Sequence, residues 1–195
     1  VVMEAKAIGE DGRTIIRHRG LEILRTVPGV LGGRGSSTPT KRVTGEIPDG
    51  ATIIEQILSD VQVNDVLASV DKVVTAEQTA VFSRIGEYVR NTHSDLLIAR
   101  QGKLRMPIVQ GQQQVGLVGE YLTKAFGAPW FTNGWLRLKF INPLEVFDPI
   151  TLTAKVIDIE KIETNEIKVG LEVWIRRASD NKMTTVGWAS CVIPG

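Results

Sequence analysis

The last third of the chain alternates apolar and polar residues with a period of two, a pattern typical of strands that bury one face. Several such stretches follow one another, and short turn sequences separate them. Because these connections are short, we expect consecutive strands to pair side by side as an antiparallel meander. The predicted strands are 136–140, 150–163, 167–175 and 183–193. This pattern restricts the fold more than any other feature of the sequence.

A helix is predicted just before these strands, over residues 111–126. Its apolar residues recur every three or four positions, and Gly127 stands where helices commonly end. Gly116 and Gly119 interrupt it, and a glycine inside a helix costs about 1 kcal/mol relative to alanine. Close approach of a sheet would explain both glycines, so we expect the sheet to wrap around this helix. The apolar positions are Val115, Val118, Leu122 and Phe126.

Two further segments carry signals for the start of a helix. Thr75 and Gln78 have the spacing of a capping box, and so do Thr52 and Glu55. Aliphatic residues follow in both cases, so we expect one helix to begin at each threonine. The apolar stripe of the helix after Thr75 comprises Val81, Phe82, Ile85 and Val89.

The first 45 residues differ in character from the rest. Residues 2–8 and 14–27 are predicted to form a hairpin, and residues 29–39 are rich in glycine and serine, which is typical of a linker. We therefore divide the chain into an N-terminal part, 1–45, and a main domain, 46–195. Two interpretations of the hairpin stay open: a remnant of an otherwise absent first half of the protein, or an independent decoration.

The composition argues against several kinds of partner. The chain has 23 Lys and Arg against 22 Asp and Glu, so no net charge is available to hold nucleic acid or an acidic membrane. Cys191 is the only cysteine, and the two histidines lie far apart in the sequence, so neither a disulfide nor a metal site is expected. The sequence contains no apolar run of roughly 20 residues and no signal-peptide pattern at its start. These observations predict a soluble, cytoplasmic protein.

Five short segments carry a family resemblance when they are read in order with the helix and strands. They are Val74-Thr75-Ala76-Glu77, Gly86-Glu87 leading to His93, Pro107-Ile108-Val109-Gln110-Gly111, Phe126-Gly127-Ala128-Pro129-Trp130 and Asp148-Pro149-Ile150-Thr151-Leu152. Over roughly residues 60–195 the chain resembles the MaoC-like dehydratase and enoyl-CoA hydratase family of the hotdog superfamily. The resemblance implies an α+β hotdog fold, an antiparallel sheet wrapped around a central helix. In this chain an N-terminal β-hairpin would extend that fold.

Members of this family add water across the double bond of a trans-2-enoyl thioester, usually linked to coenzyme A, or catalyse the reverse dehydration. The resemblance implies that His93 and Glu87 act on water as base and acid, and that the Gly111 N–H contacts the thioester oxygen. A backbone N–H at the start of a helix suits developing negative charge, because it is unpaired and lies at the positive end of the dipole. Coenzyme A would enter as part of the substrate, with no other cofactor.

The family motif reads Gly-Asp-x-Asn-Pro-x-His, and this chain departs from it. Between Gly86 and His93 it keeps an acid and an asparagine, lacks the proline and holds one extra residue. Gln110 replaces a histidine that often precedes the helix glycine. Plain structural interpretations therefore stay open, with His93 as an ordinary loop histidine and Glu87 as a solvated carboxylate.

Further residues are expected to contact the substrate. Asn91 and Gln110 adjoin the predicted catalytic groups, and Arg100, Lys103 and Arg105 provide positive charge for a nucleotide tail. The alternative interpretations are a cap or turn former for Asn91, an exposed first-turn residue for Gln110, and solvated surface charges for the three cations.

Two other functions stay open beside hydration. One is a non-catalytic subunit that binds acyl thioesters, and the other is a thioesterase, for which Glu120 is the only acid on the central helix. In each case we expect a homodimer or a pseudo-dimer of hotdog units, because such pairing covers exposed strand edges.

Overall fold

In the computed structural model of the protein, the described residues are 2–21, 42–83, 90–163 and 165–195. The chain divides into two compact units, Val1–Thr40 and Lys41–Gly195. The first unit contains the antiparallel strands β1 (Val2–Ile8) and β2 (Thr14–Leu21), joined by a turn with Gly12 at a φ of 78°. This confirms the predicted hairpin as far as residue 21. The rest of its predicted second strand and the Gly/Ser-rich linker lie outside the described residues.

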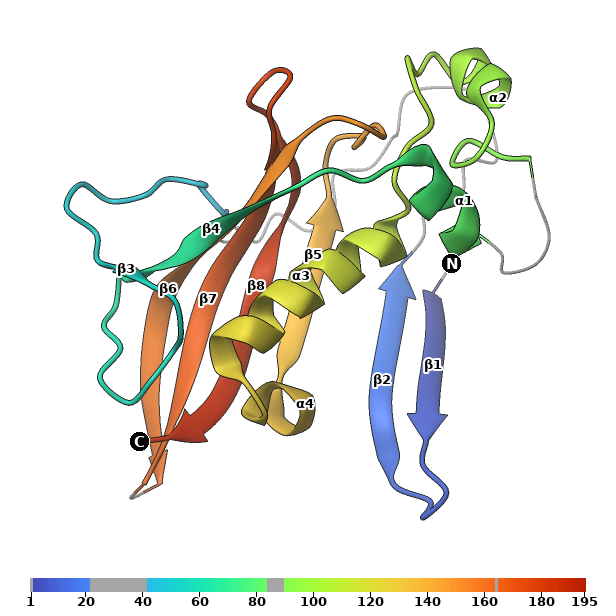
Figure 1. The fold of residues 1–195 in the computed structure, drawn as a ribbon. Helices are drawn as coiled ribbons and strands as arrows, with labels where there is room; N and C mark the ends of the chain where they lie inside the picture. Colours follow the sequence, from blue (N-terminus) through green and yellow to red (C-terminus); the bar gives the residue numbers. More distant parts are fainter. Residues whose placement is uncertain (1, 22–41, 84–89, 164) are drawn as a thin grey trace, which may run out of the picture. The chain divides into compact units, whose positions relative to one another are not determined.

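The second unit is built on a six-stranded sheet with the order β3-β4-β6-β7-β8-β5 (Figure 1). Strands β6, β7 and β8 pair antiparallel as consecutive neighbours, which confirms this part of the predicted meander. The strands are β3 (Ile53–Ile54), β4 (Val66–Lys72), β5 (Trp135–Phe140), β6 (Ile150–Glu163), β7 (Glu166–Arg177) and β8 (Met183–Pro194).

The predicted pairing of β5 with β6 is wrong, because β5 pairs antiparallel with β8 instead. The connection from β5 to β6 turns away from the sheet and forms its own hydrogen bonds. Within it, Leu144 O accepts from Val109 N at 2.8 Å, and Val146 N donates to Pro107 O at 2.9 Å. These bonds hold the connection against the segment that leads into the central helix, and β5 becomes an edge strand.

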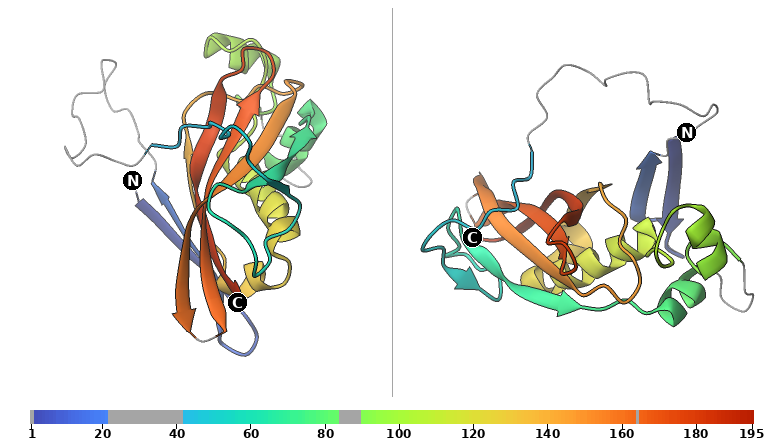
Figure 2. Two further views of the ribbon diagram at one scale, coloured as in Figure 1. Left: turned by 90° about the vertical axis from the view of Figure 1, so that its left-hand side faces the viewer. Right: turned by 90° about the horizontal axis from the view of Figure 1, so that it is seen from above.

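The helix α3 (Gly111–Phe126) crosses one face of the sheet, as Figures 1 and 2 show, and its bounds match the prediction. Its buried face includes Val118, Leu122 and Phe126. These side chains meet the inward faces of the long strands in one continuous apolar core. Burial of each such side chain stabilises the fold by about 1.5–3 kcal/mol, so this contact fixes the helix on the sheet. The strand residues in this core include Leu152, Ala154, Val156, Val169, Leu171, Val173, Ile175, Ala189 and Cys191.

The explanation predicted for the two helix glycines is wrong. An added Cβ at Gly116 or at Gly119 would meet no atom within 4 Å, so the sheet does not approach the helix there. Gly116 is exposed and Gly119 is half-buried. Nothing else in the described residues explains either glycine.

The helix expected after Thr75 is α1 (Ala76–Ser83), and its capping box is present. Thr75 N donates to Gln78 Oε1, and Gln78 N donates to Thr75 Oγ1. The predicted apolar stripe is wrong in its described part, because Val81 and Phe82 are 63% and 49% exposed. Ile85 and Val89 lie outside the described residues.

No helix begins at Thr52. Ile53 and Ile54 form strand β3, which pairs in parallel with Val66 and Leu67 of β4. These β-branched isoleucines suit a strand better than a helix, so sheet pairing prevails over the capping-box pattern. Two short helices complete the unit, α2 (Leu96–Gln101) and α4 (Pro129–Asn133).

The outer face of the sheet is partly covered by the segment 42–47. Val43 packs with Trp174 and Val186 in a second apolar cluster. Arg176 Nη2 donates to Gly45 O at 3.1 Å, and Lys155 Nζ donates to Glu46 O at 3.3 Å. This cover explains why Trp174 is buried although it is not part of the core that contacts α3.

Candidate active site

Two loop segments meet at the start of α3 and bring His93 close to the residues that precede Gly111. Ile108 N donates to Thr92 O at 3.1 Å, and the ring nitrogen Nδ1 of His93 lies 2.8 Å from Ile108 O. His93 N also donates to Asn91 Oδ1 at 2.8 Å. The turn 91–94 is therefore tied to the strand-like segment that enters the helix.

The contact with Ile108 determines which tautomer His93 adopts. A carbonyl oxygen can only accept, so Nδ1 must carry the proton and donate it. In the neutral ring Nε2 then keeps its lone pair, and no group in the described part of the chain is hydrogen-bonded to it. A half-buried histidine held in this way can take up a proton at Nε2.

Gly111 is the first residue of α3, and its N–H has no acceptor among the described residues. The space beside its α-carbon is not open, because an added Cβ would lie 2.8 Å from Cε2 of Phe140. The glycine therefore lets the Phe140 ring, at the end of β5, pack against the helix start. Phe140 is 49% exposed, so its ring is bounded by protein on one side only.

A pocket of about 320 Å³ lies beside this helix start, and we call it the glycine pocket. Most of its wall is apolar. Its polar side is fixed by Gln114, a buried residue whose Oε1 accepts a hydrogen bond from Thr185 Oγ1. The lining residues are Ile108, Val109, Gly111, Gln114, Phe140, Ile141, Asn142, Pro143 and Leu144. An apolar pocket of this size that is lined by the first residue of a helix can hold a short acyl group.

Gln110 has its side chain on another element. Its Nε2 donates to Thr79 O at 2.8 Å and to Ser83 Oγ at 2.6 Å, so the amide links α1 to the start of α3. Thr79 O can only accept, which fixes the orientation of the amide. Its Oε1 is buried and has no hydrogen-bond partner among the described residues.

Glu87, the predicted catalytic acid, lies outside the described residues. Asn91 forms a turn, because its Oδ1 accepts from His93 N, and Asp95 caps α2 by accepting from the N–H groups of Leu97 and Ile98. The Arg90 guanidinium, and then the N–H of Ile98, lower the pKa of Asp95.

The three predicted substrate-binding cations lie in α2 or in the segment just after it. Arg100 is exposed in the last turn of α2, and Lys103 is exposed just beyond it. Arg105 pairs with Glu145, since Nη2 lies 2.9 Å from the carboxylate Oε2. Lys103 and Arg105 line a second pocket, which we call the charged pocket, of about 340 Å³. Its other lining residues are Leu104, Pro143, Glu145, Arg177, Ser179 and Asp180.

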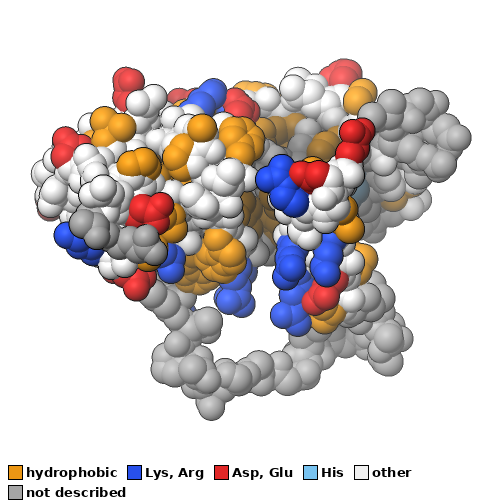
Figure 3. Space-filling model, turned by 90° about the horizontal axis from the view of Figure 1, so that it is seen from below, with side chains coloured by type: hydrophobic (Ala, Val, Ile, Leu, Met, Phe, Trp, Pro, Cys, Tyr) orange, Lys and Arg blue, Asp and Glu red, His pale blue; other side chains and the backbone are white. Residues whose placement is uncertain are grey.

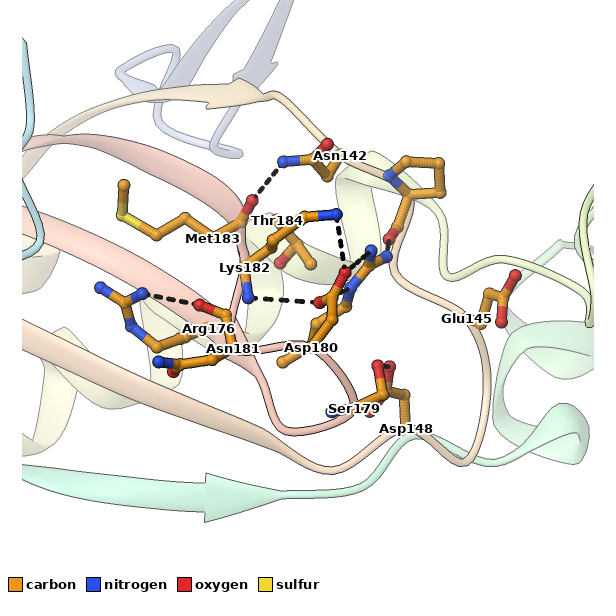
Figure 4. A network of polar contacts seen from close by, with 12 residues as sticks. Asn142, Glu145, Asp148, Arg176, Ser179, Asp180, Asn181, Lys182, Met183 and Thr184 are labelled. Carbon is orange, nitrogen blue, oxygen red and sulfur yellow. Dashed lines mark hydrogen bonds and ion pairs between the residues drawn. The ribbon is translucent and has the colours of Figure 1, made fainter.

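A polar network shapes the charged pocket, and the sequence did not reveal it. Figure 4 shows Asp180 at the β7–β8 turn, where it accepts hydrogen bonds from Nε and Nη2 of Arg177. The same guanidinium donates from Nη1 to Pro143 O, and the Asp148 carboxylate accepts from Ser179. Arg177 holds the pKa of Asp180 well below its usual range.

The described residues give less support to a metal site or to thioester hydrolysis. They hold no group of three or more His, Cys, Asp or Glu that could bind a metal. Glu120, the acid considered for thioester hydrolysis, pairs with Lys72 and Lys124, and these two lysines lower its pKa. No helix in the described ranges is long and apolar enough to cross a membrane.

No protein-family model matches the sequence, and no curated protein matches it. Solved structures do match the fold. An (R)-hydratase from A. caviae involved in PHA biosynthesis is 20% identical, with a TM-score of 0.56 over 69% of this chain and 98% of that chain. A MaoC-like dehydratase from Rhodospirillum rubrum is also 20% identical, with a TM-score of 0.57 over 70% and 95%.

A third match extends over nearly the whole chain. A putative MaoC domain protein dehydratase from Chloroflexus aurantiacus has a TM-score of 0.63 at 11% identity. The match covers 99% of this chain and 64% of that protein. The second unit therefore has the hotdog fold. Its structural neighbours include MaoC-like dehydratases and (R)-hydratases.

Proposed function

We propose that this protein is a hydratase or dehydratase that acts on trans-2-enoyl and 3-hydroxyacyl thioesters. The observation that carries the proposal is that His93 is held against the segment that leads into α3, which begins at Gly111. The contact between His93 Nδ1 and Ile108 O leaves Nε2 without a partner among the described residues. Gly111, three residues after Ile108, has an N–H with no acceptor in the same part of the chain. The glycine pocket supports the same assignment, because it is apolar where an acyl chain would lie.

The proposed reaction is a balanced addition of water. His93 Nε2 takes a proton from water as the water oxygen bonds to the β-carbon and the carbon–carbon π bond opens. Negative charge moves to the thioester oxygen, where the Gly111 N–H stabilises it as an enolate. Collapse of the enolate takes a proton at the α-carbon, and the product is the 3-hydroxyacyl thioester. Dehydration follows the same steps in reverse.

We assign the delivery of the α-carbon proton to Glu87, and the proton that His93 took from water returns to Glu87 through solvent before the next turnover. The assignment rests on the family resemblance, in which an acid precedes the histidine by a short loop. This chain holds one extra residue between Glu87 and His93, and the longer glutamate side chain would compensate for the changed spacing.

Replacement of His93 by alanine tests the base directly. General acid–base groups contribute about 10²- to 10⁴-fold to a rate, so kcat for hydration of a crotonyl thioester should fall by that factor. The other histidine gives a matched control, because His18 lies on β2 of the first unit, and His18→Ala should keep wild-type turnover. Loss of the enoyl absorbance band measures the rate, and circular dichroism checks the fold. Equal rates in His93→Ala and wild type would exclude this mechanism.

We also propose that two hotdog units pair. Strands β3 and β5 are the edges of the sheet, and Trp135 of β5 and Phe131 of the preceding helix α4 are 52% and 72% exposed. Figure 3 shows apolar side chains exposed among polar ones on the surface seen from below.

The interpretation of the β1–β2 hairpin as a remnant of an otherwise absent first half also remains a proposal. It is supported by the fold match that extends over 99% of this chain within a longer MaoC domain protein.

A further inference from the structure

The charged pocket carries a surplus of positive charge that is not used inside the protein. Its wall contains three cationic side chains and two carboxylates. Both carboxylates are already paired, Glu145 with Arg105 and Asp180 with Arg177. An anion that enters the pocket would therefore meet neutralised acids and one net positive charge.

Two cations in this wall keep donors free for a ligand. No hydrogen bond or ion pair within the described residues involves the ammonium group of Lys103. Arg105 uses Nε and Nη2 for Glu145, and its side chain is 73% exposed, so Nη1 stays available. Each of the three nitrogens of the Arg177 guanidinium already donates to Asp180 or Pro143, so this side chain shapes the wall.

The backbone of Lys103 is a second sign of a functional role. Its φ is 63°, in the left-handed region that glycine and asparagine favour at the end of a helix. Gly102, the neighbouring glycine, has a φ of −78° and does not occupy that position. A lysine held in this conformation is disfavoured, and such residues concentrate at binding sites.

The charged pocket also adjoins the proposed reaction site. Pro143 lines both the charged pocket and the glycine pocket. Its carbonyl oxygen accepts from Arg177 Nη1, which fixes the boundary between the two. A ligand with an acyl thioester at one end and an anion at the other could therefore extend past Pro143 and occupy both pockets.

We propose that the charged pocket binds a phosphate of the carrier to which the acyl group is attached, with Lys103 and Arg105 as the donors. This proposal rests on the proposed hydratase function and names the carrier. Phosphate fits because a guanidinium and an ammonium group are the donors that proteins commonly use for it. The phosphate of phosphopantetheine and the nucleotide phosphates of coenzyme A share this chemistry.

The test compares three crotonyl thioesters, those of coenzyme A, of 4′-phosphopantetheine and of phosphate-free pantetheine. Lys103→Asn removes the charge and suits the left-handed backbone. We expect the ratio of kcat/KM for crotonyl-CoA to that for crotonyl-pantetheine to fall about tenfold in this variant, as for one lost charged contact. Lys103→Arg should restore the ratio. The matched control is Lys161→Asn, an exposed lysine near the other end of β6, which should keep the wild-type ratio.

The comparison among the three thioesters identifies which phosphate of the carrier binds in the charged pocket. A loss shared by crotonyl-CoA and crotonyl-phosphopantetheine assigns the pantetheine phosphate, and a loss confined to crotonyl-CoA assigns the nucleotide. A wild-type ratio in Lys103→Asn would overturn the proposal.

The two proposals fail separately. If the wild-type protein hydrates none of the three thioesters, the hydratase function fails, and calorimetric binding of coenzyme A tests the pocket alone. Binding that is about tenfold weaker in Lys103→Asn, and weaker at high salt, would support the pocket. Equal binding by both proteins, or no binding by wild type, would overturn it.

Discussion

At the scale of single residues, His93 illustrates how a backbone contact prepares a side chain for chemistry. The Ile108 carbonyl holds Nδ1, so orientation and tautomer are set without a carboxylate partner at that nitrogen. The family resemblance identified His93 and Gly111, but no sequence pattern revealed the Phe140 ring against Gly111 or the Thr185–Gln114 hydrogen bond. These contacts join residues far apart in the chain, and such pairs leave no local signal.

The reactivity of Cys191 is a prediction at this scale. Burial in the core raises the pKa of its thiol to about 11, and only the thiolate reacts with alkylating reagents. At pH 8 the folded protein should therefore be alkylated far more slowly than the protein in urea. The rate in the folded state should rise with pH up to about 11, where the thiol ionises. Mass spectrometry of iodoacetamide-treated samples measures both rates, and rapid labelling of the folded protein at pH 8 would refute the burial.

At the scale of elements, the sequence predicted best where the periodicity was strong and uninterrupted. Helix α3 and the strands β6, β7 and β8 were identified because their apolar residues recur at regular intervals over twelve or more residues. Short elements were predicted less well. The capping-box spacing at Thr52 is a pattern of two residues, and sheet pairing outweighed it. The place of β5 beside β8 depends on the path of a loop, which periodicity does not report.

Gly116 within α3 and Gly127 just after it give a prediction at the scale of elements. An added Cβ meets nothing at Gly116 or at Gly127, but Gly127 has a φ of 66° and Gly116 is helical. Gly116→Ala should stabilise the fold by about 1 kcal/mol, and Gly127→Ala should destabilise it by about 1–2 kcal/mol. Urea unfolding measures both values. A loss of stability in Gly116→Ala that depends on protein concentration would show that a second copy packs on this face.

At the scale of the whole molecule, the fold holds His93 against the segment that enters α3, and two pockets that share Pro143 adjoin one another. The hydratase proposal, the binding subunit and the thioesterase make different demands on this arrangement. Only hydration adds a hydrogen at the α-carbon and a hydroxyl at the β-carbon. A binding subunit leaves the thioester intact, and a thioesterase releases a free thiol.

Incubation of the wild-type protein with crotonyl-CoA in deuterium oxide, followed by mass spectrometry and NMR of the product, distinguishes these outcomes in one experiment. The proposed function predicts a 3-hydroxybutyryl thioester with one deuterium on the α-carbon. Unchanged crotonyl thioester, or free coenzyme A without hydration, would contradict it.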